Sequence, residues 1–349
     1  MYPTSLRFLP LFLSPRMTAF SVSVYPDTSF DTDTMERDYL AAAVAALPTS
    51  FRELTLRVNA AGLGNDELKK EVLHMIRRCG QTLTHLEIDV ELPAVTVHRA
   101  MRLPNLRTWK VHRSSPPATF SPSSETTTHL PALRSLALSA TNAYDWAVFL
   151  ASSYPTVDGV RSTLTELNLS DNYAVTPTLI AQICVFKNLT RLDAGYSCPK
   201  HECAFTLADD DLSRLSLALP RLEWLMLGRQ CDKNTCRTTF RSLLFLSARC
   251  PKLAFISIHF NTIQIAQDIK SLFETEDSGV KELRDSPTRC HIGTFSVYRT
   301  PLFLEGLEEL DVVKRGFSNV FPRLREIARR CGRTWQSLTE VLRKGKGLY

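Results

Sequence analysis

Apolar residues recur along this chain in one spacing: an apolar residue, a second one three positions later and a third one two positions after that. The stretch LTELNLSDN, residues 164–172, is the most regular example, with Leu164, Leu167 and Leu169 at the apolar positions and Asn172 three residues later. Alternate side chains of a β-strand point to the same face of a sheet, so Leu167 and Leu169 predict one short strand with a buried face. We expect the residues between these leucines to face solvent.

The same spacing occurs nine times, with Phe, Ile, Val, Trp or Ala accepted at the apolar positions. The matching stretches are FRELTLRV, LTHLEIDV, LRTWKV, LRSLAL, LTELNLSDN, LTRLDA, LEWLML, LAFISI and IGTFSV. Two weaker matches, MTAFSVSV and LREI, stand near the two ends of the series. This is the L-x-x-L-x-L-x-x-N pattern of a leucine-rich repeat, in which each unit contributes one strand and one returning segment.

The segments between the predicted strands carry helix signals. After Asn65, a potential cap, apolar residues follow the spacing of a helix: Leu68, Val72, Met75, Ile76 and Cys79. Thr176 followed by Pro177 is typical of a helix start, and residues 209–211 place three acids in a first turn. We therefore predict an α/β leucine-rich-repeat solenoid, a horseshoe with a short-stranded parallel sheet on the concave face and helices on the convex face.

We divide the chain into three parts. Residues 1–20 are a ragged first partial repeat, residues 21–327 form the solenoid, and residues 328–349 form a basic capping helix or tail. The Ser/Thr/Pro-rich stretch at about 112–129 predicts a flexible loop between two repeats. The chain carries a net charge of +6, but residues 314–349 alone hold ten basic and two acidic residues. The basic character therefore belongs to the tail, which suits an acidic partner or a solvated capping helix. No RNA-binding motif accompanies it, so we do not expect nucleic acid as a partner.

Composition and motifs narrow the chemistry. The chain contains no P-loop, G-x-S-x-G, H-E-x-x-H or G-x-G-x-x-G motif, so we expect no catalytic residue, no cofactor and no enzymatic activity. No apolar run is long enough to span a bilayer, and the N-terminal apolar run is broken by Pro10. The nine cysteines show no secreted-scaffold rhythm, which favours a reducing compartment, the cytoplasm or the nucleus.

Four cysteines leave a metal site open. Cys198 and Cys203 form one C-x4-C pair and Cys231 and Cys236 another, each pair just after the strand of an adjacent repeat. Four thiolates close together suit structural zinc, but zinc knuckles usually have two-residue spacing and turn glycines, which these stretches lack. We favour ordinary loop cysteines and predict no bound metal.

The solvent-facing strand positions change character along the chain, from polar in the early repeats to partly aromatic in the later ones. Trp224 and Phe255 occupy the same position in neighbouring repeats and should lie about 5 Å apart. Clustered aromatic side chains bordered by charges are typical of an interface hot spot. The predicted partner-binding patch on the concave face comprises Glu166, Arg191, Asp193, Trp224, Met226, Phe255, His259 and Tyr298. The alternative is that the chain's own tail or an inter-repeat loop covers these rings.

The series of phrases LPNLRTW, LPRLEWLMLG, LLFLSARCPKLAFISIHFN and FPRLREI resembles the leucine-rich-repeat regions of fungal, especially basidiomycete, F-box proteins. SARCPKL is also similar to the cysteine-containing repeat subtype of F-box proteins in general. The resemblance implies a non-enzymatic scaffold that acts as the substrate-recruiting arm of an SCF-type ubiquitin ligase. It also implies an F-box before the repeats, opening with an L-P-x-E-type motif. We find none, because LPTSFREL leads straight into a strand. We therefore expect binding to a Skp-type adaptor only if an upstream F-box exists.

Two other functions remain open. One is a leucine-rich-repeat GTPase regulator or another adaptor unrelated to ubiquitination, and the other, more remote, is an enzyme without a recognisable motif. A GTPase regulator would need an arginine or asparagine placed for catalysis on the rim, and the sequence singles out none.

Overall fold

The computed structural model describes residues 14, 16–24, 33–58, 66–89, 92–112, 132–139, 163–169, 175–195, 205–227, 236–274, 281, 292–296, 302, 304, 306–324, 326–327, 335, 338 and 340. The chain consists of two compact units, Met1–Leu164 and Thr165–Tyr349.

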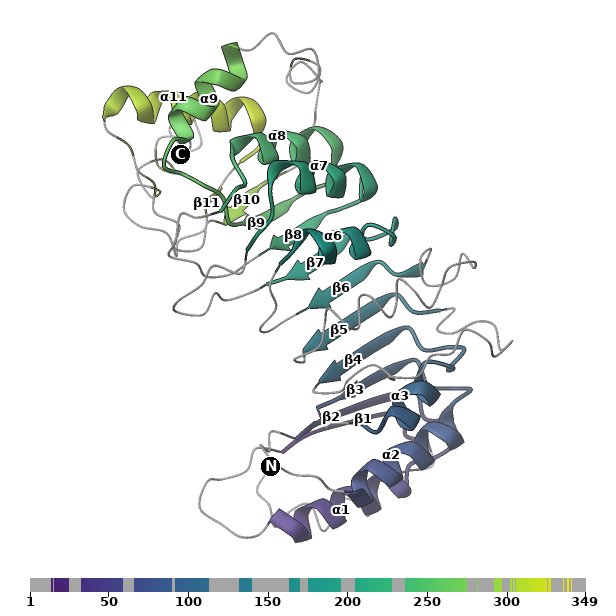
Figure 1. Cartoon of the computed structure of the whole chain (residues 1–349). Helices are drawn as coiled ribbons and strands as arrows, with labels where there is room; N and C mark the ends of the chain where they lie inside the picture. The colour runs from purple at the N-terminus through teal and green to yellow at the C-terminus, as the bar shows by residue number, and fades with distance from the viewer. Residues whose placement is uncertain are drawn as a thin grey trace. The chain divides into compact units, whose positions relative to one another are not determined.

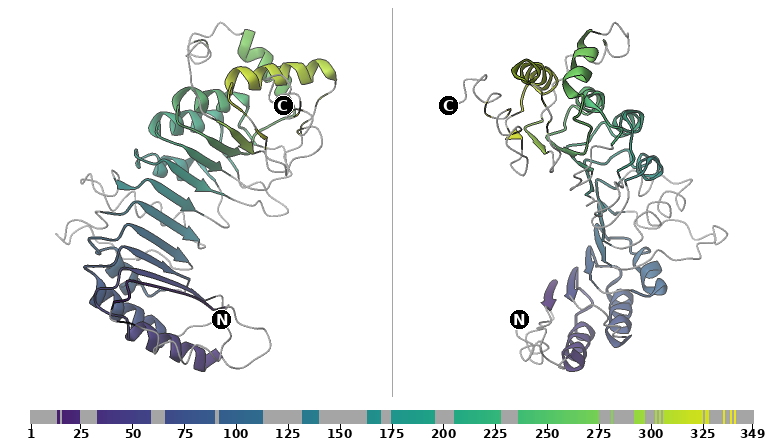
Figure 2. Two further views of the ribbon diagram at one scale, coloured as in Figure 1. Left: turned by 180° about the vertical axis from the view of Figure 1, so that it is seen from behind. Right: turned by 60° about the vertical axis from the view of Figure 1, so that its left-hand side comes forward.

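Unit 1 is a parallel sheet covered by helices on one side. Its strands pair in chain order: β1 (Ala19–Val24), β2 (Glu53–Val58), β3 (His85–Ile88), β4 (Thr108–His112) and β5 (Ser135–Ser139). Helices α1 (Asp33–Ala45), α2 (Asp66–Cys79) and α3 (Ala94–Ala100) lie along the same face of the sheet (Figures 1 and 2). Leu54, Leu86, Trp109 and Leu136, which share one repeat position, are aligned side by side and buried.

Unit 2 repeats this plan. Its strands also pair in chain order and in parallel: β6 (Glu166–Leu169), β7 (Arg191–Ala194), β8 (Trp224–Leu227), β9 (Phe255–Ile258), β10 (Thr294–Ser296) and β11 (Glu326–Ile327). Its helices are α6 (Pro177–Ile183), α7 (Asp209–Ala218), α8 (Phe240–Arg249), α9 (Ile265–Glu274) and α11 (Leu307–Val320). Helices α6 to α9 line one side of the sheet and α11 follows α9 (Figure 2).

The predicted α/β class, with an open all-parallel sheet built from repeated strand and helix segments, is confirmed within each unit. All nine predicted strands form, and the two weaker matches at the ends become β1 and β11. The five apolar residues predicted for one helix are the buried face of α2. At the start of α6, the Thr176 hydroxyl accepts a hydrogen bond from the amide of Leu179 at 3.2 Å, with Pro177 in the first helical position.

Aromatic rings fill one end of the core of unit 2. Phe317 of α11 lies edge-on to Phe295 of β10, at 5.4 Å between ring centroids, and to Phe240 of α8, at 5.2 Å. Trp335 packs against Phe260 and Phe317 at 6.2 and 6.0 Å and is fully buried, as is Leu338. These residues join strands, helices and the C-terminal segment into one apolar cluster.

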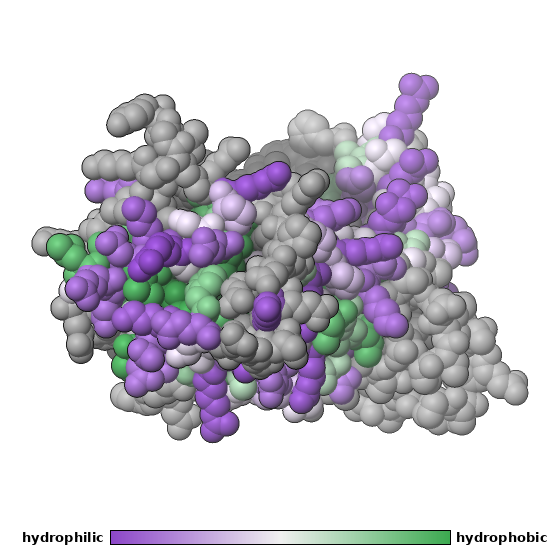
Figure 3. Space-filling view, turned by 90° about the horizontal axis from the view of Figure 1, so that it is seen from above, coloured by the Kyte–Doolittle hydropathy of each residue, from purple (hydrophilic) through white to green (hydrophobic). Residues whose placement is uncertain are grey.

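The surface of the described residues offers few apolar groups. Seen from the side that carries α9 and α11, it is mostly hydrophilic, with apolar side chains in small groups (Figure 3). The large apolar side chains that are exposed in the described segments come from different elements: Val95, Leu217, Ile263 and Leu307. Such scattered exposure is normal for folded proteins. No helix within the described ranges is long and apolar enough to cross a membrane.

Of the predicted loop at about 112–129, only His112, the last residue of β4, belongs to the described residues.

Candidate functional site

Three side chains on the sheet face of unit 2 form a continuous stack. Arg191, Trp224 and Phe255 are the first residues of β7, β8 and β9 and lie opposite one another in register. The Trp224 and Phe255 rings stack with centroids 3.7 Å apart and planes 13° apart. The guanidinium carbon of Arg191 lies 4.6 Å from the centroid of Trp224. The predicted adjacency of the two aromatic rings is therefore confirmed, and a cation extends their stack.

Glu166 extends the same row by one strand. It is the first residue of β6 and lies opposite Arg191. We call Glu166, Arg191, Trp224 and Phe255 the entry row, because each of them begins its strand. Glu166 and Arg191 are exposed, whereas Trp224 and Phe255 are half-buried. The entry row thus presents an anion, a cation and two aromatic rings in that order across the sheet.

The two charges of the entry row do not neutralise each other. Arg191 turns toward Trp224, and the structure shows no ion pair between Arg191 and Glu166. Among the described residues, neither charged group has a partner of opposite sign within 4.0 Å. A guanidinium above a ring face is attracted by the ring and can still donate its N–H groups to a carboxylate.

Three other residues of the predicted patch are buried, so the prediction that they face solvent was wrong. Asp193, Met226 and His259 expose only 4%, 8% and 5% of their surface. The Asp193 carboxylate accepts a hydrogen bond from the amide of Gly195 at 2.9 Å. The His259 ring lies edge-on to Phe205, with centroids 6.0 Å apart. The alternation within a strand identifies the sheet face of a residue, but it does not reveal what covers that face. Tyr298 lies outside the described residues.

Buried polar atoms accompany the entry row. The indole nitrogen of Trp224 and the hydroxyl of Ser257 are buried and have no hydrogen-bond partner in the described part of the chain. Ser257 lies beside Met226 in the second row of the sheet face. Burying such groups costs free energy unless they are hydrogen-bonded. The sequence predicted the aromatic character of this site but not these buried polar groups.

The sheet face of unit 1 carries a charged cluster that was not predicted from the sequence. Glu87 is buried between two cations: Arg57 Nε lies 2.6 Å from its Oε1, and Lys110 Nζ lies 2.8 Å from its Oε2. Burial would raise the pKa of Glu87, but the hydrogen bonds from Arg57 and Lys110 prevail and lower it. Opposite charges at register positions of β3 and β4 were the available signal. Because these charges satisfy one another, the cluster stabilises unit 1 and is a poorer binding site than the entry row.

Burial also lowers the pKa of nearby His85, and Lys110 lowers it further. His85 Nε2 lies 3.8 Å from Glu87 Oε2. The imidazole is therefore neutral at pH 7, and the charge balance of the cluster rests on Arg57, Glu87 and Lys110.

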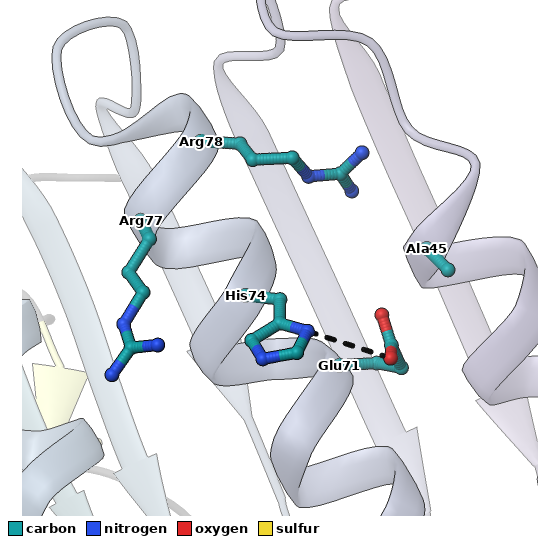
Figure 4. Close-up of a pocket in the computed structure, with 5 residues that line it drawn as sticks. All are labelled: Ala45, Glu71, His74, Arg77 and Arg78. Atoms are coloured by element: carbon teal, nitrogen blue, oxygen red, sulfur yellow. Dashed lines mark ion pairs between the residues drawn. The ribbon is translucent and has the colours of Figure 1, made fainter.

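A shallow hollow of about 350 Å³ lies between α1 and α2 (Figure 4). Its lining residues are Ala45, Glu71, His74, Arg77 and Arg78. His74 Nδ1 lies 3.7 Å from a Glu71 carboxylate oxygen, and Arg78 donates a hydrogen bond to the carbonyl of Val44 at 3.2 Å. The two arginines point in different directions (Figure 4). The hollow therefore does not gather its positive charges around one point.

The cysteine prediction stays a prediction. Cys198, Cys203 and Cys231 lie outside the described residues, and Cys236 is buried. Within the described ranges, no group of three or more His, Cys, Asp or Glu side chains is arranged to hold a metal ion.

Comparison with known proteins gives no match, either to a protein-family model or to a curated protein. Among the described residues, the entry row of unit 2 is the site that its geometry distinguishes.

Proposed function

We propose that this chain is a leucine-rich-repeat horseshoe that acts as a non-enzymatic scaffold, and that the entry row of unit 2 binds a protein partner. The observation that carries this proposal is the stack of Arg191, Trp224 and Phe255 on the sheet face. Trp and Arg are the residue types most enriched among interface hot spots.

The stack is suited to binding because it is already ordered. Each ring is held by its neighbour, so little side-chain entropy remains to be lost when a partner covers it. The half-buried rings still offer apolar area to a partner. Arg191 and Glu166 add two opposite charges. They favour a partner that places opposite charges against them.

The resemblance to fungal F-box proteins supports a more specific proposal, that the partner is a substrate recruited to an SCF-type ubiquitin ligase. This proposal rests on the phrases LPRLEWLMLG and LLFLSARCPKLAFISIHFN. Adaptor binding by a Skp-type protein would require an F-box in the same polypeptide.

The test compares a double variant, Trp224→Ala with Phe255→Ala, with the wild-type chain in affinity purification from the native cells, scored by quantitative mass spectrometry. The matched control is Leu217→Ala, which removes an exposed apolar side chain from α7. We expect at least one partner to be lost from the double variant and kept by the control, while circular dichroism shows both folded. A folded double variant that retains every partner of the wild type contradicts the proposal.

A further inference from the structure

We propose that the partner segment seated on the entry row is a helix that crosses strands β6 to β8 and carries a basic, an acidic and an apolar side chain on successive turns. This inference rests on the proposed function, because it names the chemistry of the partner that the same site would bind. It follows from the order of charges, from their spacing and from the narrowness of the accessible row.

The order of charges sets the order of the partner's side chains. Glu166 on β6 needs a cation, Arg191 on β7 needs an acceptor, and the ring pair that begins with Trp224 on β8 needs an apolar group. Because Arg191 stacks on Trp224 and does not pair with Glu166, both charges remain available to a partner. Opposed charges in a fixed order favour one orientation of the partner and penalise the reverse one.

The spacing favours a helix over an extended segment. Neighbouring strands lie about 4.8 Å apart, so Glu166 and Trp224, two strands apart, are separated by about 10 Å. On a helix, side chains three or four residues apart are separated by about 5–6 Å, and seven residues rise about 10.5 Å. On an extended strand, alternate side chains lie about 6.8 Å apart, and two such steps span about 13.5 Å. The helical positions i, i+3 or i+4, and i+7 therefore match the three strands.

The accessible surface is also narrow. The next residues on the same face lie two positions further along each strand. On β7, β8 and β9 these are Asp193, Met226 and Ser257, and all three are buried. On β7, β8 and β9, the accessible strand positions of these two rows are therefore those of the entry row, whereas on β6 Asn168 of the second row is half-buried. A helix that crosses the strands can contact every residue of the entry row. An extended segment laid parallel to β7 or β8 would contact only one residue of that row.

The experiment selects binders from two displayed peptide libraries against the purified full chain. One library has a helical scaffold with randomised surface positions, and the other carries the same randomisation with a central Pro-Pro pair that prevents a helix. Selection against wild type is compared with selection against the Trp224→Ala, Phe255→Ala double variant. We expect enrichment from the helical library on wild type, with Lys or Arg, then Asp or Glu, then Leu or Phe at the three predicted positions.

The affinity of one selected peptide is then measured on single variants by fluorescence anisotropy. Glu166→Lys and Arg191→Glu should each weaken binding about 5- to 10-fold. The control, Lys252→Glu, reverses an exposed charge in the turn before β9 and should leave the affinity unchanged. A peptide with its basic and acidic positions exchanged should bind the Glu166→Lys, Arg191→Glu double variant better than it binds wild type.

The outcomes separate the two proposals. Enriched sequences that need Trp224 and Phe255 but lack the charge order, or that come equally from the Pro-Pro library, overturn this inference and leave the proposed function standing. Equal enrichment on wild type and on the aromatic double variant, or none on either, counts against both.

Discussion

At the scale of single residues, the sheet faces of the two units differ in whether their charged side chains form ion pairs with one another. In unit 1, Glu87 lies within hydrogen-bond distance of both Arg57 and Lys110, so a buried anion is compensated within the fold. In unit 2, Arg191 lies on an aromatic ring and Glu166 has no ion pair among the described residues. A compensated buried charge stabilises the structure only while both partners are present, whereas uncompensated exposed charges are available for recognition.

The lowered pKa of Glu87 predicts a specific acid sensitivity. A carboxylate with a lowered pKa in the folded state contributes stability above its ordinary value of 4.5, and this contribution is lost as pH falls through the lowered pKa. We expect Glu87→Gln to lower the free energy of unfolding by about 1 kcal/mol at pH 7, since Arg57 is half exposed and screened by solvent. At a pH below the lowered pKa, the difference from wild type should shrink.

Urea unfolding at a series of pH values checks this prediction, with Glu53→Gln as the control. Glu53 is an exposed acid that lies on the same face of β2 as Arg57. If both variants follow the same pH dependence relative to wild type, the Glu87 cluster does not stabilise the fold as described.

At the scale of elements, side chains tie the helix of one repeat to that of the next. Asp209, the first residue of α7, accepts hydrogen bonds from the amide and the hydroxyl of Thr239, both at 2.7 Å, and from the hydroxyl of Ser242 in α8. Asp211 accepts a bond from the amide of Ala208 at 2.9 Å. The acids predicted for the first turn of this helix therefore have separate roles: Asp211 caps α7, and Asp209 connects α7 to α8.

Asp209→Ala removes this connection and leaves three donors without their acceptor. We expect the free energy of unfolding to fall by about 2 kcal/mol. Asp210→Ala removes the adjacent, exposed acid. It should lower the free energy of unfolding by no more than a few tenths of the loss expected for Asp209→Ala. Chemical denaturation of the two variants measures the difference, and equal losses would show that helix-terminal charge alone matters here.

Close approach of α9 and α11 requires a glycine. A Cβ at Gly316 would lie 2.8 Å from both Cγ2 and Cδ1 of the buried Ile269. We expect Gly316→Val to lower the free energy of unfolding by about 2 kcal/mol through overpacking. Adding Ile269→Ala to this variant should recover part of the loss, which a double-mutant cycle measures. If the two losses simply add, the contact does not limit the packing of these helices.

At the scale of the whole molecule, the core of unit 2 depends on a residue far along the chain. Trp335 is fully buried against Phe260, just after β9, and Phe317 of α11. Trp335 thus covers apolar surface of Phe260 and Phe317 that would otherwise meet water. Leu338, three residues further on, is buried as well.

Trp335→Ala should therefore destabilise the end of unit 2, with a loss of about 3–5 kcal/mol. Thermal unfolding followed by circular dichroism measures the fall in Tm. Leu307→Ala, at a position 82% exposed in α11, is the control and should leave the Tm nearly unchanged. An equally small effect of both substitutions would contradict a capping role for Trp335.

The sequence by itself determined the strands of the described residues, the buried face of α2 and the adjacency of Trp224 and Phe255. These features depend on local periodicity and on a repeat spacing that aligns equivalent positions of neighbouring strands. Only the tertiary structure decided that Asp193, Met226 and His259 are buried, that Glu87 lies between two cations, and that Arg191 stacks on Trp224. Coverage of a face and choice of rotamer depend on groups that are distant in sequence, and the pattern within one repeat carries no information about them.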